Sequence, residues 1–315
     1  METNNMDKKL TFSPKITQAI KAKLYEFDGV RVNILKKKKI VWAIFGVLVV
    51  IASSVAWSLE IPQVLFAIPF FAFFGIGYIS VTKGKLAEEF KNEILTKQME
   101  SIDEVKYHAN DSISLSEFYE SNIYHNRIDR YSGEDLFEGK KDKTTYKFSE
   151  ILAEEKHTTT DSKGRTKTTW VTIFNGIMMI ADFNKIIKSE TRVIQRSESF
   201  FNKWFKNKTK VELESPEFEK MFETYSQDQV EARYILTPSM MERILKLQKS
   251  MGSKVHLSFN GSKVYIAISN SYNFFEADLD QPINSEQIER IFGEIRECIE
   301  IIDILDLNTR IWTKK

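Results

Sequence analysis

Two long apolar segments dominate the pattern of hydrophobic and polar positions along the chain. Residues 40–59 and 61–81 are 20 and 21 residues long, and neither contains a charged side chain. An α-helix rises about 1.5 Å per residue, so each segment is long enough to cross the roughly 30 Å hydrocarbon core of a bilayer. The pattern therefore predicts a transmembrane helical hairpin over residues 40–81, which turns at Glu60. The alternatives, a buried helix of a soluble protein or a secretory signal peptide, do not explain two such segments in tandem.

The charges around this hairpin predict its orientation. Residues 1–39 contain ten basic and four acidic side chains, whereas residues 82–315 contain 35 basic and 39 acidic ones. Lysines occupy positions 36–39 before the first span and recur after the second span at Lys83, Lys85 and Lys91. By the positive-inside rule, both termini are cytoplasmic and the turn at Glu60 faces outward. The aromatic residues expected at the membrane interfaces are Trp42, Trp57 and Tyr78.

Apolar residues at helical spacing continue on both sides of the hairpin. Ser13 and Pro14 provide an N-cap and a first-turn proline for a helix that runs from about residue 14 toward the lysines. After the hairpin the same spacing continues to about Met99. We expect the two helices to form an antiparallel pair, and the alternative is a basic amphipathic helix that lies on anionic lipid. Residues 1–39 are thus predicted to be a basic cytoplasmic N-terminal helix.

Residues 82–315 predict a cytoplasmic α+β domain with a mainly antiparallel sheet. The sequence SLSE at residues 114–117 is a capping box, which predicts a short helix. Two polar strand pairs follow, with turns expected around Gly139 and Gly164. The apolar stretch 174–183 predicts a strand in which Gly176 lies either in a hairpin turn or at a bulge, and the continuous apolar pattern favours the bulge.

The segment 255–269 predicts a tight β-hairpin. Asn260-Gly261 is typical of a type I′ turn, and pairing outward from it places Leu257 opposite Val264 on one face. His256 is then opposite Tyr265 on the other face, where we expect a half-exposed partner rather than a metal ligand.

The last predicted helix starts near residue 284 and ends near Leu307. Its apolar stripe consists of Ile288, Ile291, Phe292, Ile295, Cys298, Ile299 and Ile302. Cys298 is the only cysteine, so an intrachain disulfide is excluded, and a buried inert thiol is expected.

The chain contains no P-loop, dinucleotide-binding fingerprint, nucleophile elbow or HExxH sequence. Its four histidines are scattered, so neither a metal site nor a cofactor is expected. The lysine-rich stretch 201–210 interleaves aromatic residues with four lysines, as a nucleic-acid or lipid surface does. Because residues 82–315 carry a net negative charge, we interpret this stretch as a solvated loop and expect no nucleic-acid partner.

One cluster has the composition of an active site, since it places Asp228, Glu231, Arg233 and Tyr234 within seven residues. Residues 230–236 alternate in part and predict a short strand, after which Thr237-Pro238 starts a helix. We therefore expect Asp228 and Glu231 to serve a turn and Arg233 to pair with one of them. The alternative is a ligand or partner surface formed by the four side chains.

Several separated blocks resemble a bacterial membrane protein family, the domain of unknown function 3137. They are RIDRYSGEDLFEG at residues 127–139, FNGIMMIADFNK at 174–185, the segment 215–268 and the closing LNTRIWTKK. The resemblance implies a protein of the bacterial cell (inner) membrane with paired N-terminal spans and a cytoplasmic domain. It implies no catalytic residue or cofactor. Genes of this family often neighbour those of LemA-like membrane proteins, which suggests a partner.

These observations favour a membrane-tethered interaction or scaffold protein. The competing hypothesis is an enzyme at the cytosolic membrane face, with its site around Asp228, Glu231, Arg233 and Tyr234. Convergence of these four side chains in a pocket would favour the enzyme, and separate local contacts would favour the scaffold.

Overall fold

The computed structural model describes residues 17–59, 67–100, 105–196, 209–270 and 273–309. The chain divides into two compact units, which are described separately. The helical unit comprises residues 1–98 and 276–293, and the sheet domain comprises residues 99–275 and 294–315. The predicted class is confirmed, because the protein is α+β with an antiparallel sheet and several helices.

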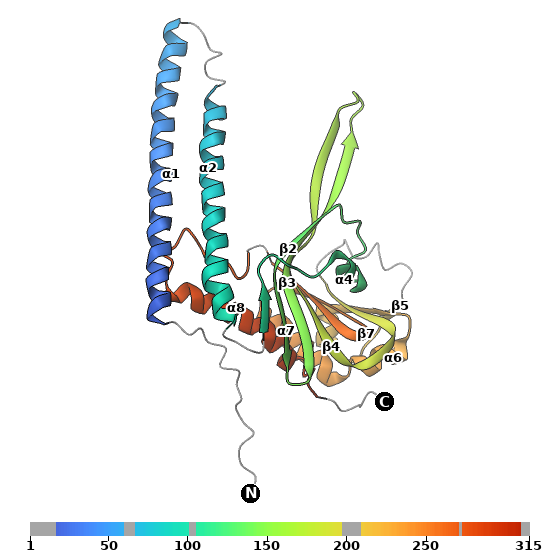
Figure 1. Ribbon diagram of the computed structural model, residues 1–315. Helices are drawn as coiled ribbons and strands as arrows, with labels where there is room; N and C mark the ends of the chain where they lie inside the picture. Colours follow the sequence, from blue (N-terminus) through green and yellow to red (C-terminus); the bar gives the residue numbers. More distant parts are fainter. Residues whose placement is uncertain (1–16, 60–66, 101–104, 197–208, 271–272, 310–315) are drawn as a thin grey trace. The chain divides into compact units, whose positions relative to one another are not determined.

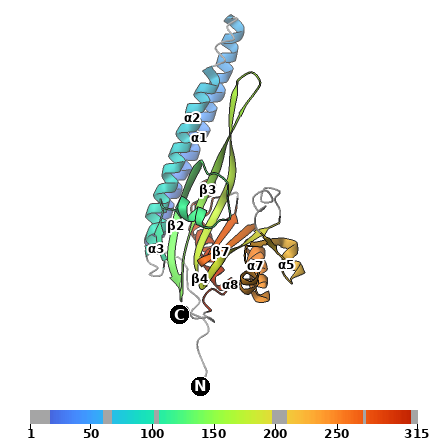
Figure 2. The ribbon, with the colours of Figure 1, turned by 90° about the vertical axis from the view of Figure 1, so that its right-hand side faces the viewer.

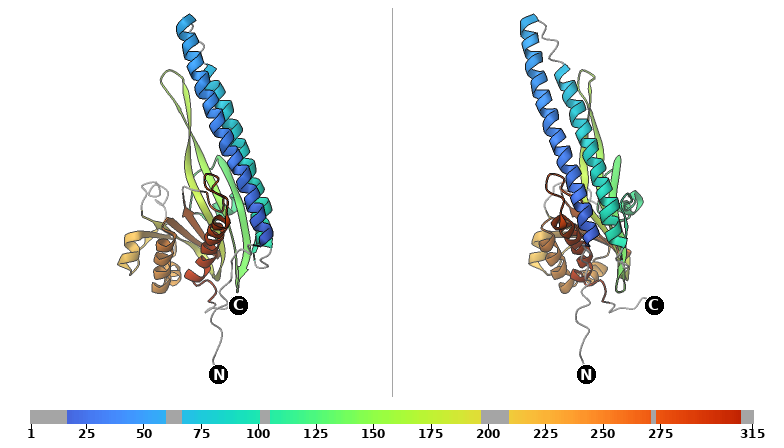
Figure 3. Two further views of the ribbon diagram at one scale, coloured as in Figure 1. Left: turned by 90° about the vertical axis from the view of Figure 1, so that its left-hand side faces the viewer. Right: turned by 60° about the vertical axis from the view of Figure 1, so that its left-hand side comes forward.

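The helical unit is built on two long helices that lie side by side (Figures 2 and 3). Helix α1 (Gln18–Leu59) runs without a break through the lysines at 36–39, so the predicted N-terminal helix and first apolar segment form one helix. Helix α2 (Ala67–Phe90) continues through a π-helical turn, η2 (Lys91–Leu95), into α3 (Thr96–Glu100). The predicted cap at Ser13 and the turn at Glu60 lie outside the described residues.

The ends of α1 and α2 that carry polar residues pack against each other, as the spacing predicts. The rings of Phe27 and Phe90 meet edge to face with their centroids 6.0 Å apart, and Lys23 forms an ion pair with Glu93. Leu24 and Leu86 are buried beside them. The antiparallel pairing of the two flanking helices is therefore confirmed.

The segment 276–293 binds to this helix pair through polar contacts. Asp28 accepts hydrogen bonds from Arg31 Nε at 2.7 Å and from the backbone N of Ile283 at 2.9 Å, and these bonds lower its pKa. Lys83 lies 2.7 Å from Asp280 and Lys91 lies 3.3 Å from Glu276. The sequence pattern did not predict this attachment, because it depends on residues that lie between 185 and 255 positions apart.

The sheet domain contains seven strands in the order β1-β2-β3-β4-β6-β5, with β7 also paired to β4, and all the pairs are antiparallel. The strands are β1 (Val105–His108), β2 (Arg130–Lys141), β3 (Thr144–Thr160), β4 (Thr166–Gln195), β5 (Thr209–Val211), β6 (Phe222–Ser226) and β7 (Lys254–Ser269).

Helices and loops cover both faces of this sheet. The helices are α4 (Leu115–Glu120), α5 (Pro216–Met221), α6 (Gln229–Ile235), α7 (Pro238–Met251) and α8 (Ser285–Ile304). On one face, Phe118 of α4 and Tyr124 pack against Phe174, Met178 and sheet residues around them. Side chains alternate along a strand, so Met179 and its neighbours are buried on the opposite face, where α7 and residues 294–304 of α8 lie (Figure 1).

The predicted hairpin at 255–269 is wrong, because the segment forms one strand, β7. Its two halves pair with β4 in separate registers, Val193 with Leu257 and Ala181 with Val264. Gly261 has a φ of 61°, so the Asn-Gly pair forms a local irregularity within the strand instead of a turn between two strands. His256 is buried, and its Nδ1 accepts a hydrogen bond from the backbone N of Gln195.

The predictions at three other glycines, Gly139, Gly164 and Gly176, have different outcomes. The turn at Gly164 is confirmed, but the turn between β2 and β3 lies at residues 142–143, and Gly139 is paired within β2. Gly176 lies within β4 between Ile151 of β3 and Ser269 of β7, which excludes a hairpin turn there. The β3–β4 register shifts three residues earlier, at Ile173, so the bulge does not fall on the glycine.

The remaining helix predictions are confirmed. Ser114 caps α4 in a capping box, and Thr237 caps α7 with Pro238 in its first turn. The predicted apolar stripe of α8 is buried throughout. Burial raises the pKa of the Cys298 thiol, as expected for an inert cysteine.

Candidate functional site

The predicted strand at residues 230–236 is wrong, because residues 230–235 lie in helix α6 and Leu236 is the C-cap of that helix. Asp228 is the N-cap, and its Oδ1 accepts hydrogen bonds from the backbone N of Val230 at 2.9 Å and of Glu231 at 3.0 Å. An aspartate in this position satisfies amide groups that have no partner within the helix. Asp228 therefore has a structural role in starting α6.

This role gives a direct prediction for substitutions at Asp228. Asp228→Ala should lower the free energy of unfolding by about 1 kcal/mol, because the cap is lost, whereas Asp228→Asn should preserve it, since asparagine caps as well as aspartate. Urea denaturation of the purified chain measures both. A loss of partner binding in Asp228→Asn, with stability unchanged, would instead assign the carboxylate a function beyond capping.

The other three residues of the cluster make separate contacts. Glu231 accepts hydrogen bonds from the backbone N of Lys188 at 3.0 Å and of Ser189 at 2.6 Å, both in β4. Arg233 donates to the carbonyl O of Glu212 at 3.4 Å and to Oε1 of Gln229 at 3.3 Å, instead of to Asp228 or Glu231 as predicted.

Tyr234 makes its contact with Lys185 of β4. The Nζ of Lys185 lies 4.3 Å from the centroid of the Tyr234 ring and donates to the Tyr234 carbonyl at 3.3 Å. Partial burial lowers the pKa of the Lys185 ammonium. Glu231 and Tyr234 thus attach α6 to residues 185–189 of β4, where the register between β4 and β7 is irregular.

An apolar surface lies on the two segments that these contacts join. Val230 and Tyr234 are one helical turn apart on α6, with 77% and 48% of each residue exposed, and Ile186 of β4 is 67% exposed. Lys185, Lys188 and Arg233 supply positive charge beside them. We call these six residues the α6 surface. An apolar group with a charged rim is typical of a surface that binds another protein.

A small cavity of about 230 Å³ lies next to this surface. Its lining includes Lys185, the first residues of α7 and Arg243, whose guanidinium lies 2.6 Å from Asp306. Because Arg243 is already paired, Lys185 is the main source of positive charge there. Of the four predicted residues, none lines this cavity.

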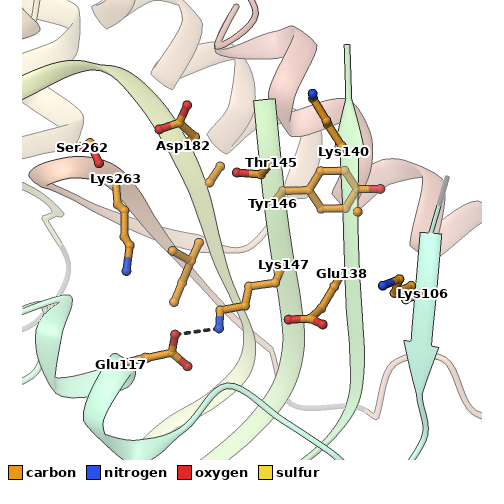
Figure 4. Close-up of a pocket in the computed structure, with 13 residues that line it drawn as sticks. Lys106, Glu117, Glu138, Lys140, Thr145, Tyr146, Lys147, Asp182, Ser262 and Lys263 are labelled. Atoms are coloured by element: carbon orange, nitrogen blue, oxygen red, sulfur yellow. Dashed lines mark ion pairs between the residues drawn. The ribbon is translucent and has the colours of Figure 1, made fainter. Parts of the chain in front are cut away.

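A larger hollow of about 640 Å³ lies over the sheet beside α4 (Figure 4). Lys106, Glu138 and Lys147 form a row across β1, β2 and β3, so their charges alternate. Lys147 lies 2.6 Å from Glu117. Burial alone would raise the pKa of Glu117, but hydrogen bonds from Lys147 and Ser114 outweigh it and lower that pKa. The charges of the hollow thus largely compensate each other.

The parts of the chain that the structure describes contain no group of His, Cys, Asp or Glu side chains that could hold a metal ion. The predicted interface aromatics Trp42, Trp57 and Tyr78 are exposed on α1 and α2. Among the described residues, one helix, Gln18–Ser58, is long and apolar enough to cross a membrane. The second predicted span and the stretch 201–210 lie partly outside the described residues.

The α6 surface, the cavity and β4 fall within a segment that is similar to known proteins. Residues 172–307 match the family "Protein of unknown function (DUF3137)". This match confirms the recognition made from the sequence. The DUF3137 segment includes all six residues of the α6 surface, whereas eight of the 13 residues that line the hollow in Figure 4 precede the segment.

Two further comparisons add little to the DUF3137 match. No curated protein matches the chain. A solved structure titled "crystal structure of the mycobacterial trehalose monomycolate transport factor A, TtfA" is 8% identical, with a TM-score of 0.30, over 64% of this chain and 88% of that chain. A likeness of this degree supports no statement about the function of the DUF3137 segment.

Sequence reasoning identified Tyr234 and Arg233 but missed the rest of the α6 surface. Val230 and Ile186 look like ordinary apolar strand residues in the sequence, and their exposure follows only from the fold. The Asp-x-x-Glu spacing from Asp228 to Glu231 resembles the start of a helix, and this signal could have identified α6.

Proposed function

We propose that the protein is a membrane-tethered interaction protein. In this proposal residues 40–81 anchor it in the bacterial cell membrane as a two-span hairpin with both termini in the cytoplasm, and the sheet domain binds a partner through the α6 surface. The apolar part of α1 is not buried by the rest of the protein, and the hydrocarbon core of a bilayer would cover it. The lysines on both sides of the hairpin support this orientation.

One observation carries the interaction half of the proposal. Among the described residues of the sheet domain, the large hydrophobic side chains that are exposed are Trp170, Ile186, Val230 and Tyr234. Three of these four belong to the α6 surface. Contact between apolar side chains and water is unfavourable, and a group of exposed apolar side chains is typical of a surface that a partner covers.

The enzyme alternative loses the observation on which it rested. Asp228 caps a helix, Glu231 contacts a strand, and Tyr234 makes a cation–π contact. Arg233 makes two long hydrogen bonds, one to a backbone carbonyl and one to a side chain. They do not converge on a common point where a substrate could react. Binding is therefore the function that these residues support best.

The charge around the α6 surface indicates the chemistry of its partner. Lys185, Lys188 and Arg233 favour a protein surface with apolar side chains and carboxylates. A membrane protein is the partner class that a tethered domain meets most often, because the tether confines both to one surface. LemA-like membrane proteins are the candidates that the family resemblance suggests. Nucleic acid is not expected.

Substitutions on α6 test this proposal. Val230→Glu combined with Tyr234→Ala should lower partner recovery after crosslinking in native membranes at least ten-fold, because the two contact residues are lost. Lys246→Ala, at an exposed position of α7, is the matched control and should leave recovery unchanged. Equal recovery from both variants, with the same thermal unfolding, would exclude the α6 surface as the binding site.

The membrane half of the proposal has its own test. A cysteine introduced at Lys9 or Lys315 should not react with an impermeant thiol reagent in intact cells, because both termini are cytoplasmic. The same cysteines should react after the cells are permeabilised, which is the control. Efficient labelling of either position in intact cells would contradict the proposed orientation.

A further inference from the structure

Strands β3 and β4 continue beyond the sheet as a two-stranded ribbon (Figure 1). Their pairing extends from Glu154 opposite Thr172 to Thr160 opposite Thr166. Residues 156–170 are exposed along their whole length, and we call them the arm. An isolated two-stranded ribbon is at best marginally stable in water, so such an arm requires reinforcement.

The structure reinforces the arm at both ends. At the tip, the Asp161 carboxylate accepts hydrogen bonds from the backbone N of Lys163 and Arg165 at 2.9 Å and from Arg165 Nε at 2.8 Å. At the base, the guanidinium of Arg130 lies 3.9 Å from the centroid of the Trp170 ring and its Nη1 is 2.9 Å from Glu154. The arm therefore holds a defined shape without an apolar core.

The arm is basic, whereas the rest of the region after the hairpin is acidic. It contains four basic residues and one acidic residue, a net charge of +3, in a region that has 35 basic and 39 acidic residues overall. Three of the four, Lys163, Arg165 and Lys167, lie at or next to the tip. At about 3.4 Å per residue, these charges lie roughly 25 Å from the last sheet residues of β3.

We propose that the arm contacts the anionic lipid headgroups of the membrane in which the hairpin is anchored. This inference rests on the membrane tether of the proposed function. The tip sequence DSKGRTK has positive charge and no apolar side chain, which suits the headgroup layer and not the hydrocarbon core. At about 1.5 Å per residue, the helical stretch 81–100 is roughly 28 Å long, which is similar to the length of the arm.

Charge and tethering favour the bilayer over a nucleic acid. A tether confines the arm near the membrane at high effective concentration. A free nucleic acid, in contrast, must approach a domain whose remaining residues carry a net negative charge. Attraction to an anionic surface amounts to about a five-fold gain for each Lys or Arg close to it. Three residues at the tip are enough for a measurable contact.

The test places a fluorescent label at Ser162→Cys in the full chain, reconstituted in bilayers that contain a headgroup-linked quencher. The native Cys298 is buried and does not compete for the label. We expect quenching in bilayers with phosphatidylglycerol, less in pure phosphatidylcholine, and a further decrease at high salt. Replacing Lys163, Arg165 and Lys167 by glutamine should weaken the contact about five-fold per charge removed. A label at Lys249→Cys, on α7, should show no quenching.

Several outcomes would overturn the proposal. These are equal quenching in both lipids, equal quenching at positions 162 and 249, or no effect of the glutamine substitutions. A response of the label to duplex DNA in the presence of anionic bilayers would assign the arm to nucleic acid instead. Alkaline carbonate extraction distinguishes failure of this proposal from failure of the proposed function. A chain that stays in the membrane fraction but shows no quenching contradicts only the contact between the arm and the headgroups. A chain that is extracted contradicts the membrane anchor.

Discussion

Replacing Gly176 by alanine is expected to lower the free energy of unfolding by more than about 3 kcal/mol. Gly176 has a φ of 147° in the middle of β4, a conformation that other residues rarely adopt. A Cβ built there would lie 2.1 Å from the carbonyl O of Ile268 and 2.8 Å from the backbone N of Asn270. Both neighbours are backbone atoms, so the clash is relieved only by separating β4 from β7.

Gly293 provides the matched control for this substitution. It lies in α8, and a Cβ added there meets nothing within 4 Å. Gly293→Ala should therefore be neutral or stabilise the protein by about 0.5–1 kcal/mol, since alanine favours the helix. Urea denaturation of the detergent-solubilised chain compares the two variants. Similar effects of both would show that β4 and β7 are not in close backbone contact at Gly176.

Replacing Arg192 by leucine is the second substitution with a large expected effect, a loss of about 3–5 kcal/mol. Arg192 is fully buried, with its Nε 2.5 Å from Glu190 and its Nη1 donating to the carbonyl O of Asn122 at 2.8 Å. It also contacts His125 Nε2. Leucine removes the cation that balances Glu190 in a buried environment, and it removes the link between β4 and the segment after α4.

Hydrogen exchange distinguishes this role from a general loss of packing. Arg192→Leu should accelerate exchange most in residues 121–128, because Arg192 holds that segment against the sheet. The control is Lys210→Ala, which removes a surface pair with Glu223 at 3.3 Å and should cost less than about 1 kcal/mol. If both variants lost the same stability, the buried contacts of Arg192 would not be important for the fold.

Helix boundaries were predictable from the sequence because their causes are local. The capping residues Ser114 and Thr237 each accept a hydrogen bond from the amide three positions later, and the apolar stripe of α8 is periodic over about four turns. The pairing of the flanking helices followed in the same way from periodicity around Leu24 and Leu86. Each of these features depends on a window shorter than the helix itself.

Strand pairing was not predictable in the same way. The Asn-Gly pair at 260–261 is compatible both with a hairpin and with an irregular strand, and only the presence of β4 along the full length of β7 decides between them. Helix α6 is only seven residues long, too short for its periodicity to be distinguished from that of a strand. Both errors concern segments whose structure depends on distant parts of the chain.

The candidate site also combines features that the sequence predicts with features that depend on distant residues. Tyr234 and Arg233 were identified from the sequence because they belong to a cluster of charged and aromatic side chains. Their contacts were not predicted. The contacts of Glu231 with Lys188 and of Tyr234 with Lys185 join positions more than 40 residues apart. The exposure of Ile186 and Val230, which carries the proposed function, is a property of the folded surface alone.

We propose that the α6 surface binds a protein partner at the membrane. The most direct test of this proposal is a photo-crosslinking amino acid at Val230 in living cells, with the same residue at Lys246 as the control. We expect one discrete adduct with a membrane protein at position 230, absent at position 246 and lost when Tyr234 is also replaced by alanine. No adduct at position 230, or the same adducts at both positions, would contradict it.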